Sequence, residues 1–225
     1  MKNTKFYKIF LQDTKNKIIN EKFGINSAWK WHNDPRQFFI SLARYKFVAK
    51  ILSGKKNVLE IGCSDGFNSR IVKQEVKNLD LCDIDKNFIQ DAKLNSSSRW
   101  KSNIFYHDFL KNKKLKKYDA IYLLDVLEHI SKSSEKKFIN NILKSLHDNG
   151  IFIIGMPSKE FQKYSRPIKI SGHINCKTAK ELKILMNKFF HNVIIFSMND
   201  ELVHTGFEKM SCYFFAVCII KKKTT

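Results

Sequence analysis

Short apolar runs alternate with stretches of helical spacing from residue 54 to the end of the chain. The runs have the length and the β-branched or aromatic content of buried strands. Strands that alternate with helices predict an α/β fold, in which helices cover both faces of a mostly parallel sheet. The predicted strands are Val58–Ile61, Leu79–Ile84, Ile104–Tyr106, Ala120–Leu124, Ile151–Ile154, Val193–Phe196 and Tyr213–Ile220.

Helices are predicted between these strands and also ahead of them. The spacing of apolar residues in 36–53 fits an amphipathic helix that Gly54 ends, whereas the first 35 residues are mixed and poorly periodic. The later helices are predicted at Phe67–Lys77, Asn87–Lys93, Glu135–Leu146 and Thr178–Phe190, the last opening on a capping box and the third followed by Asn149-Gly150.

Two glycines in five residues follow the first predicted strand, in a chain that has only eight glycines. They stand in Glu60-Ile61-Gly62-Cys63-Ser64-Asp65-Gly66, directly before a predicted helix. Glycine lets the backbone approach a ligand closely, and the carboxyl edge of a parallel sheet is where ligands bind. A plain tight turn is the alternative interpretation of this segment.

The ends of the next strands favour the ligand. Asp83 and Ile84 stand at the end of the second predicted strand, where a carboxylate can accept both hydroxyls of a ribose. Asp108-Phe109 follows the third strand and suits an adenine, which needs an acceptor for its amino group and a ring to stack on. The pattern predicts an adenosine-containing cofactor.

A dinucleotide such as NAD fits the glycine segment less well. Its fingerprint needs three glycines, and the corresponding positions here hold Gly62, Ser64 and Phe67. Phenylalanine at the third position opposes the close packing that a pyrophosphate site requires. The acid at Glu60, just ahead of the glycines, is also unlike that fingerprint.

The order of these segments resembles class I S-adenosylmethionine-dependent methyltransferases. Residues 58–66 are similar to the family's first signature, E/D-x-G-x-G-x-G, with Ser64 in place of the middle glycine. Residues 118–130 are similar to the fourth-strand signature, including the Leu-Glu-His-Ile ending of a small-molecule branch, and residues 146–152 to the segment that leads into strand five. The resemblance covers roughly Lys55 to Pro157.

This resemblance implies a Rossmann-like, seven-stranded sheet in the order 3-2-1-4-5-7-6, with strand seven antiparallel. It divides the chain into an N-terminal cap segment and helix, residues 1–53, and a methyltransferase domain, residues 54–225. S-adenosylmethionine is the implied cofactor and S-adenosylhomocysteine its product. The implied cofactor-binding residues are Glu60, Gly62, Ser64, Gly66, Asp83, Ile84, Asp108, Phe109 and Leu124.

Three histidines are candidates for the general base that a neutral acceptor hydroxyl needs near pH 7. His129 follows strand four, and His173 and His204 lie in later segments that should open on the cofactor side. Each could instead anchor a loop by binding backbone carbonyls. The candidate acceptor-binding residues are Trp29, Arg44, Tyr45, Lys46, Asn175, Asp200 and Glu201.

The predicted acceptor is a small, anionic metabolite methylated on oxygen, such as a nucleotide-linked or surface-polysaccharide precursor. Amino-methylating enzymes of DNA and protein carry D/N-P-P-Y after strand four, where this chain has Leu124-Asp125-Val126-Leu127. Oxygen is therefore favoured, with nitrogen left open. A non-catalytic binding subunit on the same fold is a further alternative.

The charge raises the alternative of an RNA substrate. The chain has 41 Lys+Arg against 21 Asp+Glu, a formal net charge of +20. Nucleic-acid readers rely on arginine, and only five of these cations are arginine, with lysines spread along the whole chain. A nucleic-acid partner is therefore disfavoured.

The five cysteines form no CxxC pair, so the sequence predicts no disulfide framework and no metal site, and a reducing cytoplasm as the location. The longest apolar run, Cys212–Ile220, is too short for a membrane-spanning helix, which predicts a soluble protein. The sequence leaves the oligomeric state open, a homodimer included.

Overall fold

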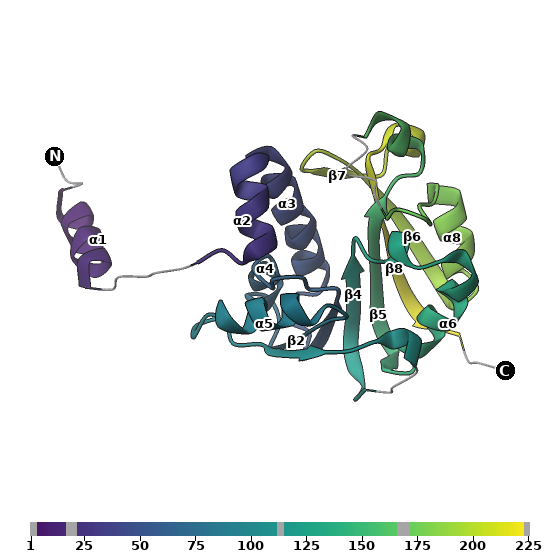
Figure 1. The fold of residues 1–225 in the computed structure, drawn as a ribbon, viewed down its shortest axis with the longest axis horizontal. Helices are drawn as coiled ribbons and strands as arrows, with labels where there is room; N and C mark the ends of the chain where they lie inside the picture. The colour runs from purple at the N-terminus through teal and green to yellow at the C-terminus, as the bar shows by residue number, and fades with distance from the viewer. Residues whose placement is uncertain (1–3, 17–21, 112–114, 166–171, 223–225) are drawn as a thin grey trace.

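The computed structural model describes residues 4–16, 22–111, 115–165 and 172–222. One eight-stranded sheet forms the centre of the molecule, with the strand order β3-β2-β1-β4-β5-β8-β6-β7 (Figure 1). Its strands are β1 (Asn57–Ile61), β2 (Asn78–Asp83), β3 (Asn103–Tyr106), β4 (Tyr118–Leu124), β5 (Leu146–Pro157), β6 (Phe190–Asn199), β7 (Leu202–His204) and β8 (Tyr213–Lys221).

The topology confirms the predicted fold class. Strands β1 to β5 pair in parallel, and β8 inserts antiparallel between β5 and β6. With β7 set aside, β8 is the expected strand seven and the order is 3-2-1-4-5-7-6. The carboxyl ends of β1, β2 and β4 therefore meet at one edge, as the sequence predicts.

The eighth strand lies between the sixth and seventh predicted strands, in a segment for which the sequence predicts no strand. Residues 199–204 instead form a hairpin, in which Asn199 pairs with Leu202 and Ser197 with His204. The turn between them is tight because Asp200 has a φ of +49°, a left-handed conformation that aspartate tolerates better than most residues.

Helices cover both faces of the sheet. On one face α3 (Pro35–Ile51), α4 (Ser69–Lys73) and α5 (Lys86–Leu94) pack over a core that includes Val58, and on the other α6 (Lys132–Leu143) and α8 (Ala179–Met186) pack over a core that includes Leu59. Neighbouring residues of β1 serve opposite cores because side chains alternate along a strand. The predicted domain boundary lies between residues 53 and 54. The helix α3 lies before this boundary, but it packs in the same core as Val58, which lies after it.

The boundary between α6 and β5 differs from its prediction. The helix α6 ends at Leu143 rather than Leu146, and β5 begins at Leu146. Tyr118 faces Leu146 whereas Ala120 faces Ile151, so β5 carries a bulge against β4. Gly150 belongs to this bulge, where a Cβ atom would lie 2.5 Å from Leu146 Cδ1. The glycine signal therefore marks a strand irregularity and not a helix end.

Two N-terminal helices were not predicted by the pattern. These are α1 (Thr4–Asn16), which lies apart from the other elements, and α2 (Ile25–Asn33), which packs beside α3 (Figure 1). Four short 3₁₀ segments complete the described elements: η1 (Phe109–Lys111), η2 (Leu127–His129), η3 (Glu160–Tyr164) and η4 (Glu208–Met210). Among the helices of the described residues, none combines the length and the apolarity that crossing a bilayer requires.

Candidate active site

Two adjoining cavities open at the carboxyl ends of the strands. The strand-end cavity has a volume of about 480 Å³ and is lined by residues that follow β1, β2, β3 and β4, among them Asp83 and Asp108. The outer cavity, of about 500 Å³, lies under Trp29, His173 and Asp200. Both volumes lie within the range of small-molecule sites. The two cavities share three lining residues, Lys30, Arg44 and Asp125.

The glycine turn positions Asp83. Gly62, Ser64 and Gly66 all have positive φ values, of +79°, +51° and +68°, which bend the chain tightly over the strand ends. This bend lets the Ser64 amide donate to Asp83 Oδ2 at 2.8 Å, while the Asp85 amide donates to Oδ1 at 2.9 Å. A carboxylate has about four lone-pair sites, so Asp83 keeps acceptor capacity for a ligand.

Three further residues form the wall next to Asp83. The Ile84 side chain is 60% exposed and lines the strand-end cavity beside Phe109 and Asp108. Asp108 Oδ1 accepts a hydrogen bond from the Leu110 amide at 2.9 Å, which fixes the carboxylate at the end of β3. An apolar wall with a carboxylate on either side is suited to a flat, polar heterocycle and its sugar.

The helix α2 closes the cavity from above by binding the glycine turn. Ser27 donates to Asp65 through its amide at 2.6 Å and through its hydroxyl at 3.1 Å. Asn26 Nδ2 donates to the Ser64 hydroxyl at 3.0 Å. A Cβ atom on Gly24 would overlap the Asp65 side chain, so the close approach of α2 depends on that glycine.

An ion pair separates the two cavities. Arg44 Nη1 lies 2.7 Å from Asp125 Oδ2, and its guanidinium stacks over the Tyr213 ring with its carbon 3.8 Å from the centroid. Asp125 has a φ of +56°, which turns its side chain back from the end of β4. Burial lowers the pKa of Lys30, which lines both cavities, and the charge of Asp125 opposes this effect.

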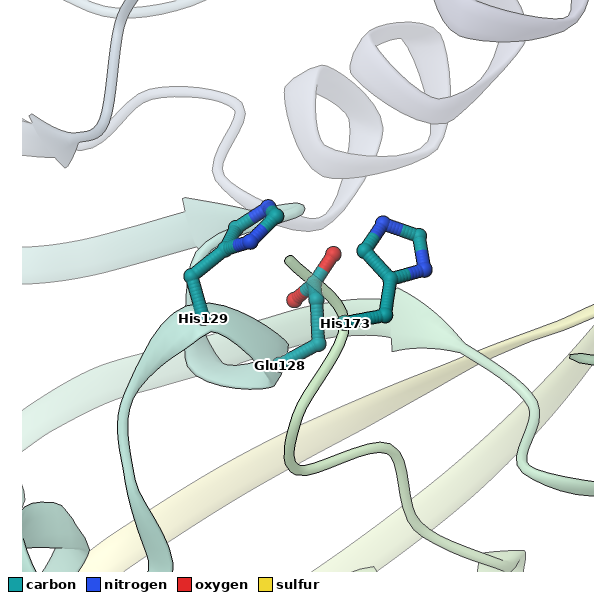
Figure 2. Close-up of side chains that lie close together, drawn as sticks. All are labelled: Glu128, His129 and His173. Atoms are coloured by element: carbon teal, nitrogen blue, oxygen red, sulfur yellow. The ribbon is translucent and has the colours of Figure 1, made fainter. Parts of the chain in front are cut away.

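Two histidines and a glutamate meet beside this ion pair. Glu128, His129 and His173 each offer a ligand atom, and these atoms lie within 4.8 Å of one another. Figure 2 shows the Glu128 carboxylate between the two imidazole rings. Burial and the charge of Asp125 raise the pKa of Glu128 well above its usual range. Burial, together with His129, lowers the pKa of His173.

A family model described as a methyltransferase domain matches residues 31–192 of the chain. The chain belongs to this methyltransferase family. A search of curated protein sequences finds no match. The family and the fold confirm the predicted cofactor, S-adenosylmethionine, since solved structures with this fold hold S-adenosylhomocysteine.

The methyltransferase resembles solved structures at low sequence identity. NodS from Bradyrhizobium japonicum, an N-methyltransferase solved with S-adenosylhomocysteine, superposes with a TM-score of 0.64 at 17% identity, covering 93% of this chain and 97% of that one. The methyltransferase domain of bacterial CtHen1 gives 0.65 at 17% identity, covering 80% and 99%. A TehB-like S-adenosylmethionine-dependent methyltransferase from Corynebacterium glutamicum gives 0.61 at 18% identity, covering 88% and 97%.

The strand-end cavity fits this cofactor. Asn68 lines it, and among the described residues nothing hydrogen-bonds to the buried Oδ1 atom of Asn68. A buried acceptor without a partner costs free energy unless a ligand supplies the donor. The cofactor carries an ammonium group and sugar hydroxyls, which can donate to Asn68 Oδ1 and to the lone pairs that Asp83 keeps free.

Glu60 does not line either cavity of the methyltransferase, although it belongs to the glycine motif. Its carboxylate is buried and accepts hydrogen bonds from the hydroxyls of Tyr45 at 2.7 Å and Tyr122 at 2.6 Å. These bonds tie β1 to α3 and β4 directly beneath the glycine turn. Burial raises the pKa of Glu60 to about 7.

The raised pKa of Glu60 predicts a pH dependence of stability. A carboxyl group whose pKa is higher in the folded state stabilises the fold below its ordinary pKa of 4.5, and this contribution is lost as the pH rises through about 7. Between pH 5 and pH 7.5 the loss is about 2 kcal/mol. We therefore expect Glu60→Gln, which keeps both tyrosine contacts, to reduce the fall in unfolding free energy over this range by that amount.

Urea unfolding of the wild type and of Glu60→Gln at the two pH values measures this difference. Glu75→Gln is the matched control, because Glu75 pairs with Lys50 at the surface. An unchanged pH dependence in Glu60→Gln would show that Glu60 is already ionised at pH 5.

Four of the seven predicted acceptor-binding residues line a cavity, and three do not. Trp29, Arg44 and Asp200 line the outer cavity, and Tyr45 lines the strand-end cavity. Lys46 and Glu201 are exposed and line neither cavity. Asn175 is buried away from both, donating to Glu135 Oε2 at 2.8 Å and accepting from Lys177 at 3.0 Å.

The three predicted histidines also separate. His129 lines the strand-end cavity and His173 the outer one. His204 lines neither; its Nε2 atom lies 2.9 Å from Asn199 Oδ1, and its Nδ1 atom accepts from the Gly206 amide at 3.0 Å. These contacts span the β6–β7 hairpin, so His204 anchors this segment through a side-chain oxygen and a backbone amide, and not through the backbone carbonyls that the alternative named.

Sequence reasoning did not select several residues that line the cavities: Lys30, Asn68, Asp125, Gln162 and Tyr213. Only Asp125 had a usable signal, because it stands at the end of a predicted strand beside the chosen Leu124. Lys30 and Asn68 lie within helices or turns whose register decides which side chains face the ligand.

Proposed function

We propose that the methyltransferase transfers a methyl group from S-adenosylmethionine to an oxygen of a small, anionic acceptor held in the outer cavity. The observation that carries this proposal is the junction of the two cavities at Lys30, Arg44 and Asp125. A cofactor and an acceptor in adjoining cavities can meet there, and the cap α2 limits the access of water.

The strand-end cavity would hold the cofactor, which when bound supplies an electrophilic methyl group on a sulfonium. Asp83 would accept hydrogen bonds from the ribose hydroxyls through the lone pairs that its two amide partners leave free. Ile84 and Phe109 would contact the adenine ring, with Asp108 facing its amino group. Gly62, Ser64 and Gly66 would let the backbone approach the ligand, and Leu124 would close the floor of the cavity.

The outer cavity suits an anionic acceptor. Arg44 and Lys30 bring two cations to its inner end, where Asp125 balances one of them. Trp29 also lines this cavity and offers an aromatic face. A phosphate or carboxylate of a nucleotide-linked or surface-polysaccharide precursor would pair with the remaining positive charge.

His129 and His173 would act on the acceptor oxygen. Both lie at the junction of the cavities, whereas the contacts of His204 favour a role in the hairpin. A neutral hydroxyl needs help to lose its proton, and imidazoles are the groups that supply it near neutral pH. Two imidazoles in this position favour a hydroxyl oxygen as the methylated atom, because an amine acceptor needs less help in losing a proton.

Calorimetry and a methyl-transfer assay test the proposal together. Titration with S-adenosylhomocysteine should give a dissociation constant of about 1–10 μM or tighter. Labelled methyl from the cofactor should appear on nucleotide-sugars or acidic glycans and not on bulk RNA. An absence of binding heat would contradict the cofactor site, and labelling confined to RNA would replace the small acceptor with a nucleic acid.

A further inference from the structure

We propose that Glu128, His129 and His173 bind a divalent first-row transition-metal cation at the junction of the two cavities. Metal binding stands on the geometry of these three side chains alone. Its catalytic role rests on the proposed function, in which an acceptor oxygen approaches the same junction.

The Glu128 carboxylate is the first reason. The residue is 0% exposed, and within the described part of the chain neither of its carboxylate oxygens has a hydrogen-bond partner. Its backbone carbonyl accepts from the amides of Ile174 at 2.9 Å and Asn175 at 3.0 Å, which fixes η2 against the segment that carries His173. A buried carboxylate with no donor is costly to the fold unless it binds a ligand.

The nearby cation does not fill this role. Arg44 directs its guanidinium to Asp125, at 2.7 Å, and stacks on Tyr213. Glu128 therefore remains without a salt bridge among the residues that the structure describes.

The histidines present the correct nitrogen atoms. His129 Nδ1 lies 3.0 Å from the Gly172 carbonyl oxygen, which requires a proton on Nδ1. His173 Nδ1 lies 3.0 Å from Gln162 Oε1, and Gln162 is held in this orientation because its Nε2 donates to the Ser158 carbonyl at 3.0 Å. Both rings therefore leave Nε2 with a free lone pair. Such hydrogen bonds orient histidine ligands in metal sites.

The distances allow one ion to reach all three side chains. One ring nitrogen of each histidine and one carboxylate oxygen of Glu128 lie within 4.8 Å of one another, and the two rings are 5.2 Å apart between centroids in an edge-on arrangement. Bonds of about 2.0–2.2 Å bring ligand atoms to within about 4.2 Å of each other. Small rotations of the His129 and His173 side chains would close the remaining gap.

The ligand set selects the metal class. Two imidazoles and one carboxylate suit zinc and neighbouring transition ions, whereas magnesium prefers an octahedron of oxygen ligands. Three protein ligands leave a coordination position open. Because His129 lines one cavity and His173 the other, that position would lie where the acceptor oxygen meets the cofactor methyl.

With the metal bound, the cation would replace the free imidazoles as the group that assists the acceptor in losing its proton, and it would make the acceptor oxygen more nucleophilic. Bound to the metal, the acceptor hydroxyl would lose its proton to solvent more readily. The oxygen would then form a bond to the methyl carbon as the bond between that carbon and sulfur breaks. The products are the methyl ether, S-adenosylhomocysteine and one released proton, and the metal is neither oxidised nor reduced.

Cobalt titration of the chelator-treated, full-length protein tests the site directly. Co²⁺ should bind one equivalent with visible absorption bands of a site containing nitrogen ligands, and Zn²⁺ should displace it. Glu128→Gln, His129→Asn and His173→Asn should each weaken Co²⁺ binding by at least about 100-fold, more than the loss of a hydrogen bond to a metal ligand costs. His191→Asn is the matched control, because His191 is exposed and distant in the sequence, on β6, and should bind Co²⁺ like the wild type.

Binding of S-adenosylhomocysteine checks that the variants are folded and keeps the two proposals distinguishable. If the cofactor product binds normally and Co²⁺ shows no saturable binding, or binds all four proteins equally, the metal site is wrong and the proposed function stands. If one equivalent of Co²⁺ binds and depends on Glu128 and both histidines, the metal site is supported even where no acceptor oxygen is methylated. Preference for Mg²⁺ over Co²⁺ would also overturn the assignment.

Discussion

Replacement of Asp83 with asparagine is expected to weaken S-adenosylhomocysteine binding by at least about 100-fold. Asp83 receives the Ser64 and Asp85 amides on separate oxygens, so both oxygens are already oriented toward donors. An asparagine would place its own NH₂ group against one of these amides. It would also lose the charge that strengthens each ribose hydrogen bond, and bonds to a charged group contribute about 1.5–3 kcal/mol each.

Isothermal titration with S-adenosylhomocysteine measures this effect, and Asp119→Asn supplies the control. Asp119 also accepts from a backbone amide, that of Asn57 at 2.8 Å, but at the opposite end of the parallel strands. Its replacement should alter stability without altering affinity for the ligand. Equal affinity of Asp83→Asn and the wild type would remove Asp83 from the cofactor site.

The fold was predictable because its main signals are local. Buried parallel strands are continuous apolar runs, and seven of the eight strands correspond to such a run. The exception, Leu202–His204, has three residues and depends on the left-handed turn at Asp200. The helix α2 was not predicted for a related reason: its exposed Trp29 and Trp31 break the apolar period, and its contacts with the glycine turn are polar bonds.

The site was predictable only where topology alone decides position. The ends of β1, β2 and β4 must share an edge in a parallel sheet, which brings Gly62, Asp83 and Leu124 to one cavity. Side-chain direction was not predictable in the same way. Glu60 is adjacent to the glycine turn but faces Tyr45 and Tyr122, since alternate residues of a strand point to opposite faces.

Contacts between distant segments were beyond the sequence signals. Arg44 and Asp125 are 81 residues apart, and neither position has a pattern that points to the other. The cluster of Glu128, His129 and His173 has the same character, because His173 is brought to the other two by backbone bonds from residues 174 and 175 to Glu128. The sequence predicts no metal site because no ligand residues stand at the short separations typical of such sites. A site whose ligands come together only through tertiary contacts does not show those separations in the sequence.

Gly62→Ala is the second substitution with a large expected effect, a loss of about 3 kcal/mol in the free energy of unfolding. Two causes act together. Gly62 has a φ of +79°, where a Cβ atom costs about 1–2 kcal/mol. The same Cβ atom would overlap Cγ2 of Val126, and forcing extra volume into a packed site costs about 1–3 kcal/mol. The turn would move away from the strand ends, so cofactor binding should weaken as well.

Urea unfolding of three variants separates these causes. Gly54 has nearly the same φ, +80°, but a Cβ atom there would meet nothing within 4 Å, so Gly54→Ala should show the conformational cost alone. Gly62→Ala combined with Val126→Ala removes the overlap, and its loss should fall short of the sum of the two single losses by about 1–3 kcal/mol. Additive losses in the double variant would mean that Val126 already has room to move. The tight junction between the turn after β1 and the end of β4 would then owe its shape to the backbone conformation of Gly62 alone.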